Sequence, residues 1–231
     1  MAFLYLVATP IGNLGDISQR AIQTLKEVSF ILVEDSRVSR RLMDQFEITT
    51  PVKIYHDFNK EKVTAGIIRN MLDGNDVALI TDAGTPGIAD PGFYITREAI
   101  ANRIPVIPIP GPSSLIAAIS ASGLPCDRFI FENFLPPKSG KRKTFFSRHK
   151  DEKRTVIFFE SPHRVVKVLT EMNEILGDIA VVIARELTKM HEEFLRGTPA
   201  ELLVHFEQHK PRGEMVVLFN SGFSFKRANP R

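Results

Sequence analysis

The sequence predicts an α/β protein of two lobes: an N-terminal lobe with a mostly parallel, doubly wound sheet and a C-terminal lobe with a mixed sheet. Three observations carry this expectation. Short apolar runs that fit buried strands alternate with amphipathic stretches of helical period as far as residue 121. Rigid loops rich in glycine and proline follow several of these runs. Beyond Gly123-Leu124-Pro125, which reads as a hinge, the pattern changes. We therefore expect an N-terminal domain over 1–121 and a C-terminal domain over 122–231.

The elements of the first lobe follow from their apolar patterns. Five short apolar runs predict strands over 3–8, 30–33, 53–55, 77–80 and 106–107. Apolar residues at helical spacing predict helices over 17–28, 60–72 and 93–101, and an apolar helix runs from 115 to about 121.

The second lobe mixes the two kinds of element less regularly. The apolar runs predict strands over 128–131, 155–159, 179–184, 194–196 and 213–219. Amphipathic patterns predict helices over 165–176 and 199–206. A third helix, anchored by Phe145 and Phe146, is expected in the basic segment between the strands at 128–131 and 155–159. A basic tail follows from Asn220 to Arg231.

Composition narrows the class of protein. The hydrophobic share of 43%, the charged share of 25% and the net charge of +3 are ordinary globular values, so a polyanionic partner must be argued from local clusters. The single cysteine, Cys126, excludes an intramolecular disulfide and a multi-cysteine zinc site. The apolar N-terminus is too short for a signal peptide, and no run approaches the roughly 20 apolar residues of a membrane span. We expect a soluble, cytoplasmic protein.

The loop over 82–92, D-A-G-T-P-G-I-A-D-P-G, organises the chain. Its glycines let backbone amides approach a bound molecule, and its prolines keep the turn rigid. Similar loops follow the runs 3–8 and 106–107, and ligands of open α/β sheets bind beyond the carboxyl ends of the strands. A tight turn without a ligand is the alternative. The polar residues Glu34 to Arg37 also follow a strand, and they either face the ligand edge or begin a helix.

Polar clusters also follow the strands that end at Phe159 and Ala184. If all six strand ends converge, they line one small-molecule cleft between the lobes, with walls of backbone amides, hydroxyls and apolar side chains. No lysine lies in the three loops, so an adenine ring with an amino-acid zwitterion fits better than a triphosphate. The histidines are scattered singly, which disfavours a metal site, and no G-x-S-x-G motif indicates a hydrolase.

A basic segment over 138–154 follows the hinge. It holds eight cations and only two carboxylates, with Phe145 and Phe146 among them. The pattern fits either a surface that contacts RNA phosphates or a solvated helix. The cations are Lys138, Lys141, Arg142, Lys143, Arg148, Lys150, Lys153 and Arg154.

Taken together, the motifs resemble the tetrapyrrole methylase superfamily. The matching pieces are V-A-T-P-I-G-N-L-G-D at 7–16, E-D-S-R at 34–37, D-A-G-T-P-G-I-A-D-P-G at 82–92, P-G-P-S-S at 110–114, F-F-E-S-P-H-R at 158–164 and R-E-L-T-K at 185–189. They are most similar to the branch that methylates the ribose 2′-hydroxyl of a cytidine in small-subunit (16S) ribosomal RNA. Ser36, Ala89 and Asn133 depart from that branch, where Thr, Ser and Gly are more usual, and many members continue into a C-terminal extension.

The resemblance implies a homodimeric enzyme that uses S-adenosylmethionine, bound in a cleft between the lobes, and acts on the small ribosomal subunit. The implied cofactor contacts, largely from backbone, are Pro10, Ala83, Gly84, Thr85, Ile88, Ser113, Ser114, Phe159, Glu160, Ala184 and Leu187. A base that takes the hydroxyl proton is expected among Asp35, Glu186 and Lys189, with an ion pair between Glu186 and Lys189 that joins the lobes as the alternative. The expected RNA contacts are Arg37, Lys138, Lys141, Arg142, Lys143, Arg148, His163 and Arg185.

Two other functions stay open on the sequence. One is methylation of a tetrapyrrole or another small molecule, for which the basic segment has no evident role. The other is a non-catalytic RNA- or nucleotide-binding module that keeps the cofactor site without turnover.

Overall fold

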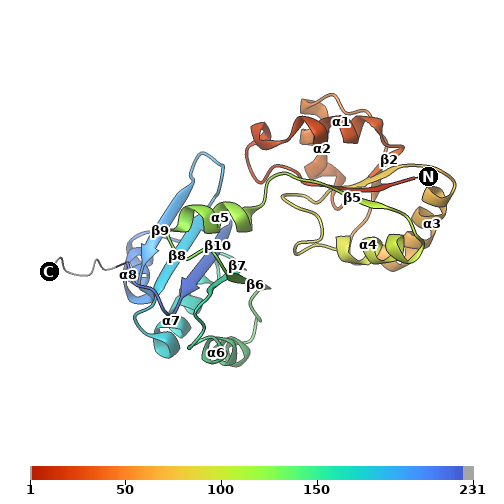
Figure 1. Cartoon of the computed structure of the whole chain (residues 1–231). Coiled ribbons are helices and arrows are strands. Elements are labelled where there is room, and N and C mark those ends of the chain that lie inside the picture. Colours follow the sequence, from red (N-terminus) through yellow and green to blue (C-terminus); the bar gives the residue numbers. More distant parts are fainter. Residues whose placement is uncertain (1, 226–231) are drawn as a thin grey trace. The chain divides into compact units, whose positions relative to one another are not determined.

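The computed structural model describes residues 2–225, and its contacts divide the chain into two compact units, 1–113 and 114–231 (Figure 1). The expected α/β class, with one parallel and one mixed sheet, is confirmed. This division lies eight residues before the domain boundary expected between 121 and 122. The expected domain boundary itself stays a prediction. Helix α5 (Ser114–Ser122) goes with the second unit because it packs on two strands of the second sheet, β10 and β8.

The first unit holds a parallel sheet of five short strands in the order β3-β2-β4-β1-β5. The central strands are almost wholly buried, as strands covered on both faces must be. The strands are β1 (Leu4–Val7), β2 (Phe30–Val33), β3 (Val52–Ile54), β4 (Val77–Leu79) and β5 (Val106–Ile109). The helices are α1 (Gln19–Glu27), α2 (Ser36–Gln45), α3 (Lys60–Leu72) and α4 (Gly92–Ala101), with a 3₁₀ turn, η1, at Leu14–Asp16.

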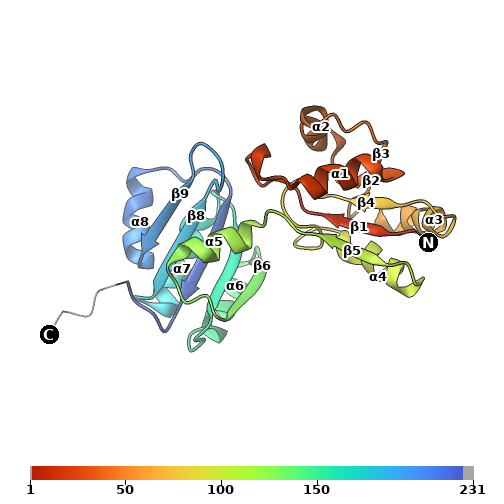
Figure 2. The same ribbon diagram turned by 45° about the horizontal axis from the view of Figure 1, so that its top comes forward.

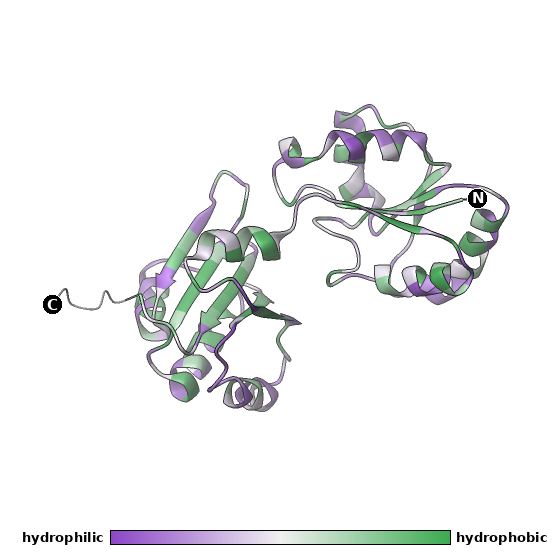
Figure 3. Ribbon diagram, in the orientation of Figure 1, coloured by the Kyte–Doolittle hydropathy of each residue, from purple (hydrophilic) through white to green (hydrophobic). Residues whose placement is uncertain are grey.

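Helices cover both faces of this sheet, as a doubly wound fold requires (Figures 1 and 2). Alternate residues of β1 divide between two cores, since Leu4 packs with residues of α3 and α4 and Val7 packs with residues of α1 and α2. In Figure 3 the strands are mostly hydrophobic and the helices carry both hydrophobic and hydrophilic residues, as helices with one buried face do.

The second unit holds a mixed sheet in the order β6-β7-β10-β8-β9. Strands β6 and β7 run parallel, and the other neighbouring pairs are antiparallel. The strands are β6 (Phe129–Phe134), β7 (Thr155–Glu160), β8 (Ala180–Arg185), β9 (Glu193–Gly197) and β10 (Met215–Asn220). The helices besides α5 are α6 (Ser139–Arg148), α7 (Val165–Leu176) and α8 (Pro199–Gln208).

One apolar core joins this sheet to α6, α7 and α8. Phe146 of α6, Leu169 of α7 and Phe206 of α8 all pack in it against strand residues such as Phe158 and Phe219. Helix α8 begins with a capping box between Thr198 and Glu201, which fixes its first turn. The second sheet is thus anchored to its helices by large buried side chains, and the edge of α6 and α7 away from the core is free to carry charge.

Two local features differ from the expectations. Helix α2 begins directly at Ser36, and the Asp35 side chain caps it by accepting a hydrogen bond from the Arg37 amide at 2.8 Å. The segment 34–37 therefore leads into a helix, which is one of the two interpretations that the sequence allowed. Strand β6 extends past 131 through an irregularity in its pairing with β7, where Asn133 has a φ of +55°. That backbone conformation favours glycine, and asparagine tolerates it, which explains the departure at Asn133.

Candidate active site

The three loops rich in glycine and proline come together at the carboxyl edge of the first sheet, where the adjacent strands β4, β1 and β5 end. Thr9 and Gly84 form an isolated antiparallel bridge, with N–H···O distances of 2.9 and 3.1 Å. The Thr85 hydroxyl donates to the carbonyl of Pro112 at 3.1 Å. The expected convergence of these loops is therefore present within the first unit.

Two glycines make this close approach possible. Gly84 has a φ of +89°, in the left-handed region that suits glycine. A Cβ on Gly111 would lie 3.0 Å from the Cβ of Ala8 and 3.3 Å from its carbonyl oxygen. A side chain at Gly111 would thus push the first and third loops apart.

The residues between these contacts offer a surface without cations. Pro10 and Gly84 are buried, Thr85 is half-buried, and Ala83 and Ile88 are exposed. Asp90 fixes the outer part of the loop, because its carboxylate accepts hydrogen bonds from the amides of Gly87 and Gly92 at 2.8 and 2.6 Å. Burial raises the pKa of Asp90 even though these amides favour its charged form.

A carboxylate cluster lies next to this loop, where β2 and β4 end. Arg37 donates hydrogen bonds to Asp35 and lowers the pKa of Asp35 to about 2. Burial raises the pKa of Asp82 and of Glu34, and neighbouring acids add to both shifts. The Asp35 amide donates to Asp82 at 3.3 Å. Sequence reasoning did not select Glu34 or Asp82 as catalytic candidates, although each stands at or just past the end of a buried strand.

In the second unit, the end of β7 carries two predicted residues that face opposite ways. Phe159 packs edge-on against Phe131 of β6, at 5.0 Å between ring centroids, and lies 5.4 Å from the ring of Phe134. Glu160 points to the helix side, where its carboxylate lies 3.2 Å from Arg164 and accepts a hydrogen bond from the Ser161 amide. Its Oε2 is buried with no hydrogen-bond partner among residues 2–225. Burial raises the pKa of Glu160.

The segment R-E-L-T-K forms a tight turn after β8. Leu187 of this turn and Ala184 of β8 are buried, while Glu186 and Thr188 have φ values of +50° and +65°. Gly213, with a φ of +79°, lies so close that a Cβ there would meet the Glu186 side chain. The turn therefore depends on glycine at this neighbouring position.

An ion network ties this turn to the start of β10. The Lys189 ammonium donates to Glu186 at 2.9 Å and to Glu214 at 2.8 Å, all within the second unit. Burial opposes the charge of each group, but the Glu214 amide and Lys189 lower the pKa of Glu186, and Glu214 and Glu186 raise the pKa of Lys189. Glu186 and Lys189 are therefore charged partners of each other, as the alternative interpretation expected, except that both belong to the same unit.

The predicted RNA contacts fall into three groups. Arg142 is buried, since its side chain is only 6% exposed in an ion pair with Glu171, and this guanidinium is part of the fold. Lys138, Lys141, Arg148 and His163 are exposed and make no ion pair with the part of the chain that is described. The others pair with nearby acids: Arg37 with Asp35, Lys143 with Glu174 and Arg185 with Glu193.

No group of three or more His, Cys, Asp or Glu side chains among residues 2–225 is placed to hold a metal ion. No helix in this range is long and apolar enough to cross a membrane.

The sequence model of the family described as "Tetrapyrrole (Corrin/Porphyrin) Methylases" matches residues 3–203. Three similar proteins carry the name "Ribosomal RNA small subunit methyltransferase I". The protein from Synechocystis is 45% identical over 94% of this chain and 78% of its own length. That from Pseudomonas aeruginosa is 48% identical, over 93% and 77%. That from Thermotoga maritima is 43% identical, over 95% and 99%.

Solved structures share the fold at low identity. A structure of diphthine synthase superposes with a TM-score of 0.75 at 16% identity and covers 95% of this chain and 90% of its own. A uroporphyrin-III-C-methyltransferase from Thermus thermophilus gives 0.63 at 18% identity, over 94% of both chains. The expected family is thus confirmed by sequence and by fold, and the chain belongs to the tetrapyrrole methylase family.

Proposed function

We propose that the chain is an S-adenosylmethionine-dependent methyltransferase that methylates the ribose 2′-hydroxyl of a cytidine in small-subunit (16S) ribosomal RNA. The observation that carries the proposal is its 43–48% identity, over 93–95% of its length, to proteins named as small-subunit ribosomal RNA methyltransferases. The convergence of three cation-free loops at one sheet edge supports a nucleoside cofactor without phosphate.

The loop edge of the first unit fits S-adenosylmethionine in its chemistry. Gly84 and Gly111 leave room for backbone groups to approach a ligand, and Thr85 and Ile88 offer a hydroxyl and an apolar side chain. When bound, the cofactor supplies a methyl group on a positively charged sulfur. The proposed contacts in the first unit are Pro10, Ala83, Gly84, Thr85, Ile88 and Ser113, and those in the second unit are Ser114, Phe159, Glu160, Ala184 and Leu187.

The residues of the second unit would contribute in different ways. Phe159 belongs to an aromatic cluster that offers ring faces to an adenine. Leu187 and Ala184 are buried, so their contribution would come from the backbone. Because the Glu160 carboxylate turns toward Arg164, we assign to Glu160 a backbone contact as well.

The proposed catalytic residues differ in their readiness to accept a proton. Asp35, with a pKa of about 2, and Glu186, with a lowered pKa, are carboxylates at neutral pH, whereas Lys189 is held protonated and cannot accept a proton. We therefore propose Asp35 or Glu186 as the base and assign to Lys189 the positioning of Glu186. Orientation of the hydroxyl would supply most of the rate, with about 10²–10⁴-fold from proton transfer. Asp82, whose pKa is raised, is an additional candidate.

The test is transfer of a tritiated methyl group to small ribosomal subunits isolated from cells that lack the enzyme. Label on the RNA supports the proposal. Label on an added tetrapyrrole supports the small-molecule alternative, and cofactor binding without transfer to either substrate supports the non-catalytic module.

The same assay at saturating cofactor tests the base. We expect Asp35→Ala or Glu186→Ala to lower turnover by about 10²–10⁴-fold. Asp178→Ala, at an exposed carboxylate in the loop before β8, is the control and should leave turnover unchanged. Unchanged turnover in Asp35→Ala, Glu186→Ala and Lys189→Ala would reject these assignments. We further propose that the enzyme is a homodimer, which light scattering of the purified protein tests, and that it is cytoplasmic, which fractionation of cells tests.

A further inference from the structure

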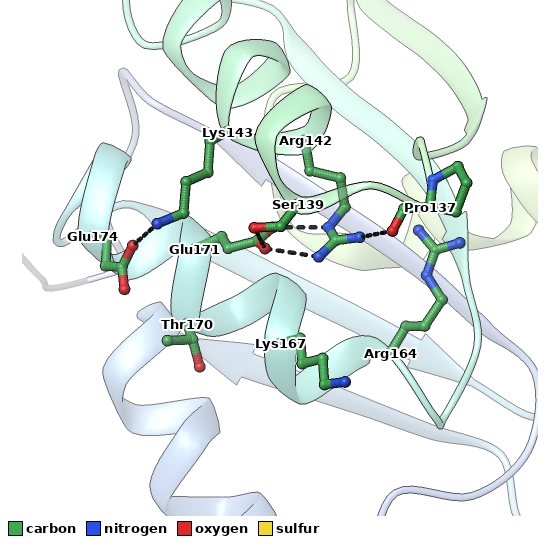
Figure 4. Close-up of a pocket in the computed structure, with 9 residues that line it drawn as sticks. All are labelled: Pro137, Ser139, Arg142, Lys143, Arg164, Lys167, Thr170, Glu171 and Glu174. Carbon is green, nitrogen blue, oxygen red and sulfur yellow. Dashed lines mark hydrogen bonds and ion pairs between the residues drawn. The ribbon is translucent and has the colours of Figure 1, made fainter.

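A pocket of about 510 Å³ lies in the second unit beside α6 and α7 (Figure 4). Its lining combines four cations with two carboxylates and two hydroxyls. The residues are Pro137, Ser139, Arg142, Lys143, Arg164, Lys167, Thr170, Glu171 and Glu174.

One ion pair forms the fixed wall of this pocket. The Arg142 guanidinium donates to both carboxylate oxygens of Glu171, each at 2.7 Å, and to the carbonyl of Pro137 at 2.7 Å. The Ser139 hydroxyl donates to Glu171 at 2.6 Å. These groups satisfy one another, so they shape the pocket and leave the α6 side of it without net charge. At the rim, Lys143 and Glu174 pair at 2.6 Å and also cancel.

The remaining two cations are not balanced in the same way. Lys167 is exposed on the first turn of α7 and makes no hydrogen bond or ion pair with residues 2–225. Arg164 uses Nη2 for the carbonyl of Leu135 at 2.8 Å, while its Nη1 has no partner among the described residues. Figure 4 shows both side chains on the same side of the pocket, below the loop at Pro137.

Arg164 forms an ion pair with Glu160 at 3.2 Å, and burial raises the pKa of that carboxyl. Burial therefore makes the charged form of Glu160 unfavourable. An anion that enters the pocket from solvent would meet the Lys167 ammonium and the Arg164 Nη1, which has no partner among the described residues. Helix α6 also begins at this wall, at Ser139, with no side-chain cap from Lys138, so its positive end favours the same sign of ligand.

We infer that this pocket binds a phosphate group of the RNA backbone, with the Lys167 ammonium and the Arg164 guanidinium as its ligands. The inference rests on the proposed function, since it names a part of the RNA substrate. The inference also replaces Arg142, which is bound to Glu171, as the expected phosphate contact. Arg164 and Lys167 take its place, and both lie outside the basic segment over 138–154. Phosphate contacts of this kind position a substrate without reading its bases.

The test compares RNA binding by three variants of the full chain. Lys167→Gln removes the unpaired cation, Lys167→Arg keeps it, and Lys210→Gln removes an equally exposed lysine that follows α8 and also lacks a partner among the described residues. The probe is small-subunit ribosomal RNA transcribed in vitro, and its affinity is measured between 50 and 200 mM salt, a range over which phosphate contacts weaken strongly.

We expect Lys167→Gln to weaken RNA binding about fivefold at the lowest salt. The slope of log K against log salt should fall by about 0.7–0.9, the effect of one lost phosphate contact. Lys167→Arg should behave like the wild type, and affinity for S-adenosylmethionine should not change in any variant. Arg164 is left unchanged because it also holds the loop at Leu135.

Two results overturn the inference while leaving the proposed function intact. One is wild-type affinity and salt slope in Lys167→Gln, and the other is an equal loss in Lys167→Gln and Lys210→Gln. If the wild-type chain transfers no methyl group to RNA, the proposed function itself fails. Methyl transfer by the wild type is therefore measured first, with isolated subunits as substrate.

Discussion

Replacing Arg142 with methionine removes one partner of the buried ion pair between α6 and α7. The side chains of Arg142 and Glu171 are only 6% and 8% exposed. Without the guanidinium, the Glu171 carboxylate keeps only the Ser139 hydroxyl as a hydrogen-bond partner. An unpaired buried charge of this kind costs about 3–5 kcal/mol of the free energy of unfolding.

The pH dependence of this loss follows from Glu171. Burial works against its charge, but Arg142 and Ser139 outweigh it and lower the pKa of Glu171. The pair therefore stabilises the native state above the unfolded pKa of about 4.3, and this contribution disappears as the pH falls through the lower native pKa. In Arg142→Met burial acts on Glu171 without the opposition of Arg142, so we expect the deficit to be larger at pH 7 than at pH 4.

The measurement is urea unfolding followed by far-UV circular dichroism, because the chain has no tryptophan. A loss of 4 kcal/mol moves the midpoint by roughly 2 M. The two units need not unfold together, so hydrogen exchange of the amides of α6 and α7 identifies the transition that moves.

The neighbouring pair is a matched control. Lys143 and Glu174 join the same two helices but are 46% and 51% exposed, so Lys143→Met should cost far less of the free energy of unfolding than Arg142→Met. The double variant Arg142→Met/Glu171→Leu should recover most of the loss. If Arg142→Met costs no more than Lys143→Met, the reasoning about the buried pair is refuted.

Three further changes test the glycine contacts and the buried acid. Gly213→Ala should cost about 1–2 kcal/mol of the free energy of unfolding, because Gly213 has a φ of +79° and a Cβ there would meet the Glu186 side chain. Gly140→Ala in α6 is the control, since a Cβ there meets nothing within 4 Å and should not destabilise the protein. Thermal unfolding compares the two variants, and equal melting temperatures would contradict the expected strain at Gly213. Glu160→Gln should stabilise the protein at pH 7 and have little effect below pH 4, because a raised native pKa means that stability is present when the group is protonated and is lost as the pH rises; urea midpoints at both pH values test this, and a loss at pH 7 would show the opposite sign. Gly111→Ala should weaken S-adenosylmethionine binding by up to about tenfold, since the new methyl group overpacks Ala8; calorimetry measures it, and wild-type affinity would show that the loops tolerate separation.

Elements with a strong apolar face were predictable from the sequence. The expected ranges 60–72 and 165–176 coincide with α3 and α7, because each buries four or more side chains at helical spacing. Helix α2 was missed because it buries only Ser39, Leu42 and Met43 and is otherwise highly polar. The signal for α2 in the sequence was the capping residue Asp35. The sequence left open whether the segment with Asp35 begins a helix or faces a ligand.

Pairings between distant residues could not be predicted in the same way. The three loops were expected together because parallel strands end at one edge, and they do meet. The partner of Arg142 lies 29 residues away on another helix, so the charge run at 138–154 shows a cation without showing that it is neutralised. The pocket beside it depends on α7, which the charge pattern of that segment does not include.

The central position of β10 in the second sheet has a consequence for synthesis. All five strands of the first sheet have been made once Ile109 is added. In the second sheet β10 lies between β7 and β8, so these two strands lack their shared neighbour until Met215–Asn220 is made. Both strands have been made once Arg185 is added, and at about 5–20 residues per second the 35 residues from there to Asn220 take about 2–7 s. During that interval the nascent second unit exposes two apolar strand edges, which makes it the stage at which a ribosome-bound chaperone has most to protect.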